Sequence, residues 1–332
     1  MRHFLTTEDW SRAEIGALLD DARALRAEPR QARLPGRTAA FVFFNPSLRT
    51  RTSFQVGFAQ LGGTPVVLDA AGTWPLEFTD GAVMDGDPEE HAKEAARVLS
   101  RYVDLIGVRA FPKFEDWSAE RGDPLLSAFA EHATVPIVNM ETIVHPCQEL
   151  AMLMAMRDAH GDFSRKKIVL TWTYHPKPLN TAVMNSGLLA TTKMGMDVTL
   201  LIPSEEYALD SMFMERGRAF ADGYGSTLTV TTDIEEAYRG ADAVYAKSWG
   251  RLDQIGLPME ERLTPDAFRR FIVDEAKMAL TNDATFSHCL PMRRNVKVTD
   301  GVADSARSLI IEEAENRLHV QKAVMSELLE DR

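Results

Sequence analysis

Two hydrophobic patterns alternate along the chain, and together they predict its fold class. Short continuous apolar runs are typical of strands buried on both faces, whereas apolar residues three or four positions apart are typical of amphipathic helices. The short runs predict strands at residues 39–44, 65–68, 104–109, 135–139, 167–172, 197–202, 227–230 and 243–246, with two further strands at 277–281 and 308–311. The spaced positions predict helices at residues 11–25, 90–101, 143–160 and 206–221, another from residue 180, and a last one at 313–329. Strands separated by helices indicate an α/β fold with two parallel sheets, joined near residue 150.

Length and composition narrow the class of protein. The sequence has 332 residues, which is long for one hydrophobic core and favours two domains. Its net charge is −12 and it has no run of lysines and arginines, which argues against a nucleic-acid partner. No apolar run reaches membrane-spanning length, and the first residues lack the core of a signal peptide. We therefore expect a soluble, cytoplasmic protein with no membrane partner.

The stretch from residue 39 to residue 54 combines a buried strand with a candidate anion site. Asn45-Pro46 ends the apolar run, because proline offers no N–H and disfavours a helical residue before it. The next residues are Ser47-Leu48-Arg49-Thr50-Arg51-Thr52, at the point where a helix should begin. The first turn of a helix attracts phosphate, and hydroxyl and guanidinium groups supply further donors. The sequence therefore predicts phosphate binding here; the alternative is a capped helix with solvated arginines.

Three other segments concentrate reactive side chains. Glu141 to Gln148 places His145 and Gln148 one helical turn apart, where both could donate to a carbonyl oxygen. Phe286 to Lys297 holds a thiol, a proline and three cations in one predicted loop, with too few ligands for zinc. Residues 314–322 read equally well as a charged helix or as part of a site. Neither G-x-G-x-x-G nor a Walker lysine motif occurs, so a nucleotide-dependent oxidoreductase lacks its fingerprint.

Taken together, these motifs resemble one enzyme family. Ser47-Leu48-Arg49-Thr50-Arg51, His145-Pro146-Cys147-Gln148 and His288-Cys289-Leu290-Pro291 are similar, in order and spacing, to three motifs of the aspartate/ornithine carbamoyltransferases. The resemblance implies a carbamoyl-phosphate domain at residues 1–148 plus about 314–332, and an amino-substrate domain at 149–313. It also implies a homotrimer whose active sites each receive a loop from a neighbouring subunit, with no metal and no cofactor.

Departures from the ornithine pattern favour the branch of this family that uses N-acetylornithine. The ornithine enzymes carry Asp-x-x-x-Ser-Met-Gly, whereas this chain has Lys247-Ser248-Trp249-Gly250, and a lysine suits a carboxylate better than an ammonium group. Counting from Trp74 places Glu89 where the N-succinylornithine enzymes have proline, although Pro88 is adjacent. Glutamate would repel the carboxylate of a succinyl group. The resemblance thus implies carbamoyl transfer to the δ-amine of N2-acetyl-L-ornithine in arginine biosynthesis. N-succinylornithine, ornithine, and a catalytically silent relative remain alternatives.

The resemblance also implies roles for individual residues. Those expected to bind carbamoyl phosphate are Ser47, Leu48, Arg49, Thr50, Trp74 of the neighbouring subunit, Arg109, His145, Gln148, Cys289, Leu290 and Arg317. Arg109, His145 and Gln148 would polarise the carbamoyl carbonyl, and the backbone carbonyls of Cys289 and Leu290 would orient the attacking amine. Those expected to bind acetylornithine are Glu89, Glu141, Asn180, Lys247, Leu290 and Lys297. Lys297 alone reads as a solvated loop lysine, but the resemblance implies that carbon dioxide carboxylates it, with Arg293 and Arg294 stabilising the product.

Overall fold

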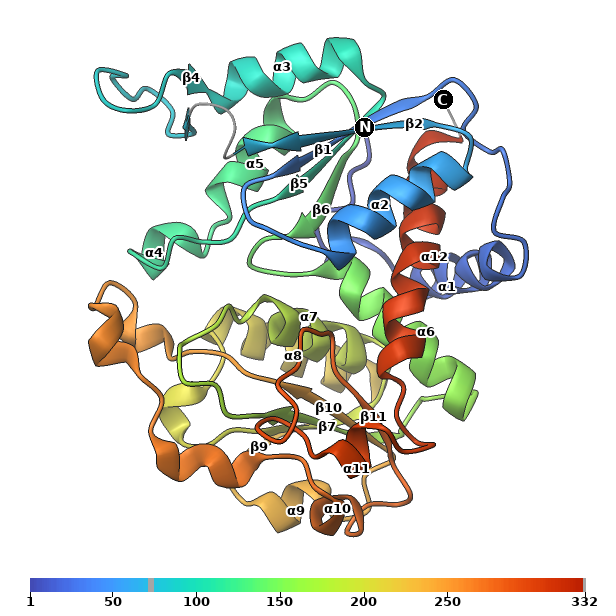
Figure 1. Ribbon diagram of the computed structural model, residues 1–332, viewed down its shortest axis with the longest axis vertical. Coiled ribbons are helices and arrows are strands. Elements are labelled where there is room, and N and C mark those ends of the chain that lie inside the picture. Colours follow the sequence, from blue (N-terminus) through green and yellow to red (C-terminus); the bar gives the residue numbers. More distant parts are fainter. Residues whose placement is uncertain (71–74, 331–332) are drawn as a thin grey trace. The chain divides into compact units, whose positions relative to one another are not determined.

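In the computed structural model, which describes residues 1–70 and 75–330, the chain divides into two compact units. The first comprises Met1–Cys147 and Arg317–Arg332, and the second comprises Gln148–Asn316. Both divisions fall within helices, α6 (Pro146–His160) and α12 (Ile310–Leu329) (Figure 1). Each unit is built on a parallel sheet, which confirms the predicted α/β class.

The sheet of the first unit has four parallel strands in the order β2 (Thr64–Asp69), β1 (Thr38–Phe43), β5 (Leu105–Arg109) and β6 (Ile137–Glu141). The helices of this unit are α1 (Arg12–Ala27), α2 (Arg49–Gln60), α3 (Ala92–Tyr102), α4 (Trp117–Glu120) and α5 (Pro124–His132). A two-stranded ladder joins β3 (Leu76–Glu77) to β4 (Glu90–His91), and neither short strand was predicted from the sequence. Helix α1 begins with a capping box, in which the Ser11 and Glu14 side chains each accept from the other residue's backbone N–H.

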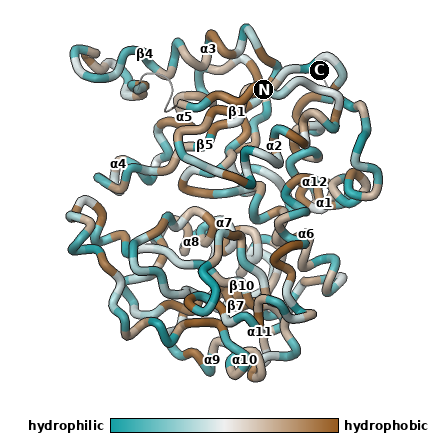
Figure 2. Tube along the Cα trace, viewed as in Figure 1, coloured by the Kyte–Doolittle hydropathy of each residue, from teal (hydrophilic) through white to brown (hydrophobic). Residues whose placement is uncertain are grey.

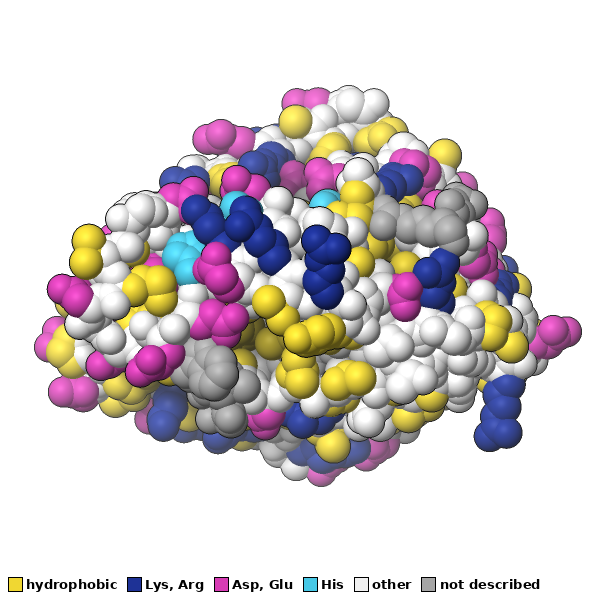
Figure 3. Space-filling view, turned by 90° about the horizontal axis from the view of Figure 1, so that it is seen from above, with side chains coloured by type: hydrophobic (Ala, Val, Ile, Leu, Met, Phe, Trp, Pro, Cys, Tyr) yellow, Lys and Arg dark blue, Asp and Glu magenta, His cyan; other side chains and the backbone are white. Residues whose placement is uncertain are grey.

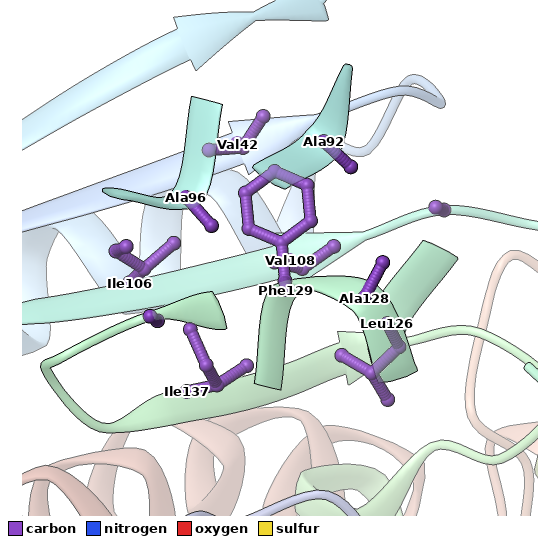
Figure 4. Close-up of a cluster of buried hydrophobic side chains, with 11 residues drawn as sticks. Val42, Ala92, Ala96, Ile106, Val108, Leu126, Ala128, Phe129 and Ile137 are labelled. Carbon is purple, nitrogen blue, oxygen red and sulfur yellow. The ribbon is translucent and has the colours of Figure 1, made fainter. Parts of the chain in front are cut away.

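Helices cover both faces of this sheet, because successive side chains of a strand point to opposite sides. On one side Phe41 of β1 packs against two phenylalanines of α2, with ring centroids 5.2 Å away for Phe54 and 6.1 Å for Phe58. On the other side Val42 joins a buried cluster with Phe129 of α5 and the alanines of α3 (Figure 4). The carboxyl end of β1 is therefore fixed from above and below, at the point where the phosphate motif begins.

The sheet of the second unit has five parallel strands in the order β11 (Thr285–Ser287), β10 (Ala243–Lys247), β7 (Lys167–Trp172), β8 (Asp197–Leu201) and β9 (Leu228–Thr231). Its other helices are α7 (Ala182–Lys193), α8 (Ser211–Tyr224), α9 (Ile234–Tyr238), α10 (Glu275–Met278) and α11 (Asp300–Ala303). Every residue of α7 is buried, and hydrophobic residues gather along β7 and β10 in Figure 2.

In the second unit two predicted strands are wrong, and one strand was missed. Residues 277–281 lie in and just after α10, whose first turn is capped by the Asp274 side chain accepting from Lys277 N at 2.9 Å. Residues 308–311 provide only a single bridge, Phe286 to Ser308, before α12 begins at Ile310. The strand that completes the sheet is instead β11, in the segment predicted to be a loop.

The described surface is mixed in charge. On the face drawn in Figure 3, acidic and basic side chains are intermingled. Across residues 1–70 and 75–330, every helix is too short or too polar to span a bilayer.

Candidate active site

The first part of the candidate site lies where β1 ends and α2 begins. Asn45 accepts a hydrogen bond from Phe111 N at 2.6 Å, which ties the end of β1 to the segment after β5. Ser47 Oγ accepts from Thr50 N at 3.2 Å and shapes the first turn of α2. The N-cap residue, Leu48, has an exposed side chain that makes no capping hydrogen bond. The positive end of the helix dipole at this turn favours a bound anion.

Arginines from separate elements converge on Thr50. Arg317 of α12 donates to Thr50 Oγ1 at 2.5 Å, and Arg109, the last residue of β5, approaches the same oxygen at 3.5 Å. Arg49 precedes Thr50 in the sequence. The side chains of Thr50, Arg109 and Arg317 are buried, so these positive charges are poorly solvated. The sequence predicted all four residues for this site, and the structure brings three of them into direct contact.

Glu141 neutralises only part of this charge. Its carboxylate pairs with Arg109 and lies 3.4 Å from His145 Nε2. The Nε groups of Arg49 and Arg109 are buried and have no hydrogen-bond partner among residues 1–70 and 75–330. A buried donor left unsatisfied costs about 1–3 kcal/mol, which a bound anion would recover. The arrangement is therefore suited to phosphate.

A short hydrogen-bonded chain supports the segment that carries Glu141 and His145. Thr142 Oγ1 donates to the Asp123 carboxylate and accepts from Asn139 Nδ2 at 2.9 Å. Burial raises the pKa of Asp123 to about 7, although hydrogen bonds from Thr142 and nearby backbone oppose the shift. Asp123 was not predicted, because its partner lies 19 positions away and only the fold brings them together.

The second unit holds a group of cations. Lys297 is buried, and this burial, together with the positive charges of Lys247 and Arg293, lowers its pKa to about 7, against an opposing effect of Cys289. Burial and the same three cations also lower the pKa of His175. The expectation of a solvated Lys297 is thus wrong. Cations gathered at the end of β10 are suited to a carboxylate.

The His288–Pro291 segment follows β11. Leu290 has φ +56°, in the left-handed region, and its N–H donates to His288 Nδ1 at 2.9 Å. That conformation costs an L-residue roughly 1–2 kcal/mol. Strained residues of this kind cluster at functional sites, where the surrounding structure maintains them. The strain is consistent with a segment that aims the backbone carbonyls of Cys289 and Leu290.

Gln148 has one side of its amide fixed. Its Nε2 donates a hydrogen bond to the carboxylate of Glu313. Because an ionised carboxylate can only accept, the NH2 group of Gln148, and not its oxygen, must face Glu313. The Gln148 Oε1 atom is buried and has no hydrogen-bond partner among the described residues. Gln148 therefore presents an acceptor oxygen, in addition to its remaining N–H.

Other predicted residues lie outside these clusters. Glu89 is exposed, with its N–H donating to Pro75 O at 3.3 Å, and Trp74 lies outside the described residues. Asn180 accepts from Ala182 N at 3.1 Å at the start of α7. Arg294, expected beside Lys297, instead pairs with Asp300 and Asp304 at 2.8 and 2.6 Å. Within residues 1–70 and 75–330, no cluster of three or more His, Cys, Asp or Glu side chains is arranged to hold a metal ion.

Two family models cover almost the whole chain. The model for the aspartate/ornithine carbamoyltransferase carbamoyl-P binding domain matches residues 2–158, and the model for the Asp/Orn binding domain matches residues 171–328. The chain belongs to the aspartate/ornithine carbamoyltransferase family.

Within this family the chain is more similar to an N-acetylornithine carbamoyltransferase than to an N-succinylornithine carbamoyltransferase. It is 57% identical over 332 residues to the N-acetylornithine carbamoyltransferase of Xanthomonas campestris pv. campestris, covering 99% of this chain and 98% of that protein. The N-succinylornithine carbamoyltransferase of Bacteroides fragilis is 38% identical over 300 residues, covering 89% and 88%. A solved structure of acetylornithine transcarbamylase complexed with acetylcitrulline has a TM-score of 0.96 and 57% identity, covering 99% of both chains.

Proposed function

We propose that this chain transfers the carbamoyl group of carbamoyl phosphate to the δ-amine of N2-acetyl-L-ornithine, giving N-acetyl-L-citrulline and phosphate, in arginine biosynthesis. The observation that carries the proposal is the buried arginine cluster at Thr50, in a chain 57% identical to an N-acetylornithine carbamoyltransferase over its full length. The cluster is suited to the phosphate group of the first substrate. The cations of the second unit are suited to the α-carboxylate of the second.

In this proposal the first unit holds the phosphate. The groups that bind it are the first turn of α2 with Ser47, Leu48, Arg49 and Thr50, and Arg317 of α12. Arginine is suited to this task because its planar fork can bond two phosphate oxygens. The site is buried and poorly solvated, so each charged hydrogen bond is worth more than in water.

In this proposal the reacting carbonyl is polarised by side chains of the first unit. Arg109 and His145 donate to its oxygen as negative charge develops, and loss of one such donor typically costs about 2.7–4 kcal/mol of barrier. From the sequence we assigned Gln148 the same role. The amide orientation favours a different one, in which its Oε1 accepts from the carbamoyl NH2 group. The planar carbamoyl group is then held by matched donors and an acceptor, which orients it for attack.

The attacking group is the neutral δ-amine of acetylornithine. It forms the new C–N bond to the carbamoyl carbon, the bond from that carbon to the phosphate oxygen breaks, and the departing phosphate accepts the amine's proton. The backbone carbonyls of Cys289 and Leu290 orient the amine, and Lys247 pairs with the α-carboxylate. Asn180 and Glu141 hold the amide end. No covalent enzyme intermediate is needed.

Carboxylation of Lys297 is part of the proposal. An amine with a pKa of about 7 is largely neutral just above that pH, and only the neutral amine attacks carbon dioxide, losing one proton to give a carbamate anion. Lys247 and Arg293 would then face an anion in place of a third cation. Protein equilibrated with 13C-labelled carbon dioxide should show one carbamate NMR signal that Lys297→Arg removes. Its absence from the unsubstituted protein at pH 8 would exclude the modification.

The specificity assignment rests on Glu89. We propose a homotrimer in which Trp74 and Glu89 of one subunit complete the site of a neighbour, where Glu89 disfavours a succinyl carboxylate by like charge. Sedimentation should give three times the chain mass of 37.0 kDa. If the protein is a monomer, neither Trp74 nor Glu89 can complete the site of a neighbouring subunit, and this part of the proposal fails.

A product assay with three amines tests the function. Carbamoyl phosphate is supplied with ornithine, N-acetylornithine or N-succinylornithine, and the carbamoylated product is read by mass spectrometry. We expect turnover of the acetyl compound, weaker turnover by Arg317→Met at the same carbamoyl phosphate concentration, and a preference shifted towards the succinyl compound in Glu89→Pro. Preference for N-succinylornithine or ornithine in the unsubstituted protein would refute the specificity. Turnover of none would indicate a catalytically silent relative.

A further inference from the structure

Glu313 lies at a junction of the second unit that the reaction described above does not use. Its side chain is fully buried in the first turns of α12. One carboxylate oxygen accepts from Gln148 Nε2 and from Tyr245 OH, the latter at 3.1 Å, and the other oxygen accepts from Ser287 Oγ. Donors from α6, β10 and β11 therefore meet on one acidic group.

The three donors differ in what they can do without the carboxylate. Tyrosine and serine hydroxyls can accept as well as donate, and they rotate to suit their partners. The Gln148 amide, by contrast, has only two orientations here, in which either its NH2 group or its oxygen faces position 313. Only an acceptor at that position holds the NH2 inward and directs Oε1 away from Glu313.

We propose that Glu313 is a positioning residue that sets the orientation of the Gln148 amide, and thereby determines that Gln148 offers an acceptor to the carbamoyl NH2 group. The inference rests on the proposed function, because it takes Gln148 as a contact of carbamoyl phosphate. In this inference Glu313 is not itself a contact of the substrate. Its effect on the reaction passes through Gln148.

Substitutions at position 313 separate this role from a merely structural one. Glu313→Met keeps the length of the side chain and removes both acceptor oxygens, so the Gln148 amide is free to turn. Glu313→Gln keeps one acceptor oxygen for Gln148, while its new NH2 group can donate to the Ser287 hydroxyl. We therefore expect Glu313→Met to lower kcat/KM for carbamoyl phosphate about tenfold, the factor for one misdirected hydrogen bond. Glu313→Gln should stay within about threefold of the unsubstituted enzyme, which is the rescue a positioning role requires. Glu312→Met, an exposed neighbour on the same helix, is the matched control.

A double-mutant cycle with Gln148→Ala decides between the two roles. If Glu313 acts through Gln148, Glu313→Met should cause no further loss of kcat/KM once the amide is gone. The same tenfold loss in both backgrounds would overturn the inference and leave Glu313 a structural residue. If Gln148→Ala alone leaves kcat/KM for carbamoyl phosphate unchanged, the proposed contact of Gln148 fails, and the positioning role fails with it. Absence of any turnover in the unsubstituted protein would instead refute the function itself.

A second pair of variants covers the case in which Glu313→Met does not fold. In Glu313→Gln combined with Ser287→Ala, the new amide loses its hydroxyl acceptor and can turn its NH2 group towards Gln148. The double variant should then lose about tenfold in kcat/KM relative to Ser287→Ala alone. Equal values for these two proteins would contradict the inference.

Discussion

Replacing Lys297 with methionine tests the electrostatics of the second unit directly. In the folded chain, burial and the charges of Lys247 and Arg293 lower the lysine's pKa from 10.5 to about 7. Between these two values the unfolded chain holds a proton that the folded chain lacks. Stability therefore rises with pH across this window, by about 1.4 kcal/mol per pH unit, and the contribution is lost as the pH falls towards 7. Below pH 7 both states are protonated and the penalty no longer changes.

Methionine fills the same space and cannot titrate, so the variant should lack this pH dependence. The free energy of unfolding of Lys297→Met minus that of the unsubstituted protein should be about 3 kcal/mol larger at pH 7 than at pH 9. The substitution is thus expected to stabilise the fold more at pH 7. The assay is urea unfolding in buffer depleted of carbon dioxide, followed by fluorescence, since Trp172 and Trp249 are buried in the same unit. Lys113→Met, at an exposed lysine of the first unit, is the control.

The outcome that would refute the reasoning is a stability difference that stays constant from pH 7 to pH 9. Bicarbonate provides an independent check. A ligand that binds only the folded state adds to its stability. Carbon dioxide that traps the neutral amine should therefore stabilise the unsubstituted protein and leave Lys297→Met unchanged.

Three further predictions concern the first unit. Arg317→Met removes a charged donor beside Thr50. Because a hydrogen bond to a charged group is typically worth about 1.5–3 kcal/mol, KM for carbamoyl phosphate should rise by about 10- to 150-fold. An unchanged KM would contradict the phosphate site. Gly107→Ala would place a Cβ 2.8 Å from Phe41 in the middle of the sheet. The free energy of unfolding measured in urea should therefore fall by about 1–3 kcal/mol. An equally stable variant would show that the sheet can adjust. Asp123→Asn should stabilise the protein at pH 8 by about 4 kcal/mol at most, but not at pH 4. The reason is that the carboxyl of the folded chain retains its proton up to about pH 7, whereas that of the unfolded chain loses it near pH 3.8. Equal effects on stability at both pH values would exclude this titration.

The sequence was most informative where neighbouring residues make the structure. The capping box of α1 joins Ser11 to a residue three positions on. The phosphate motif at Ser47 is likewise a local sequence of strand, break and helix start, so chemistry and fold could be predicted from one stretch. The approach failed at residues 277–281, where an apolar run resembled a strand but the Asp274 cap makes a helix.

The supporting residues could not be predicted from the sequence, because their roles depend on partners far away in it. Glu313 bonds to Gln148, 165 positions earlier, and nothing in Glu312-Glu313-Ala314-Glu315 distinguishes the buried glutamate from the exposed ones. Lys297 is the same kind of case. It lies between Val296 and Val298 in a segment that is otherwise polar and charged, and only the packing of the loop shows that its side chain is buried.

The way α12 completes the first unit has a consequence for synthesis of the protein. The phosphate cluster needs Arg317, and the ends of α1 and α2 are joined by Lys322, whose Nζ donates to Leu25 O at 3.1 Å and to Gln60 Oε1 at 3.1 Å. Both residues follow the whole second unit in the sequence. A ribosome therefore makes most of the first unit early but supplies its last helix only after the second unit has been translated. Until then the nascent chain lacks a completed phosphate site, so chains that stop early should bind carbamoyl phosphate more weakly than the complete chain.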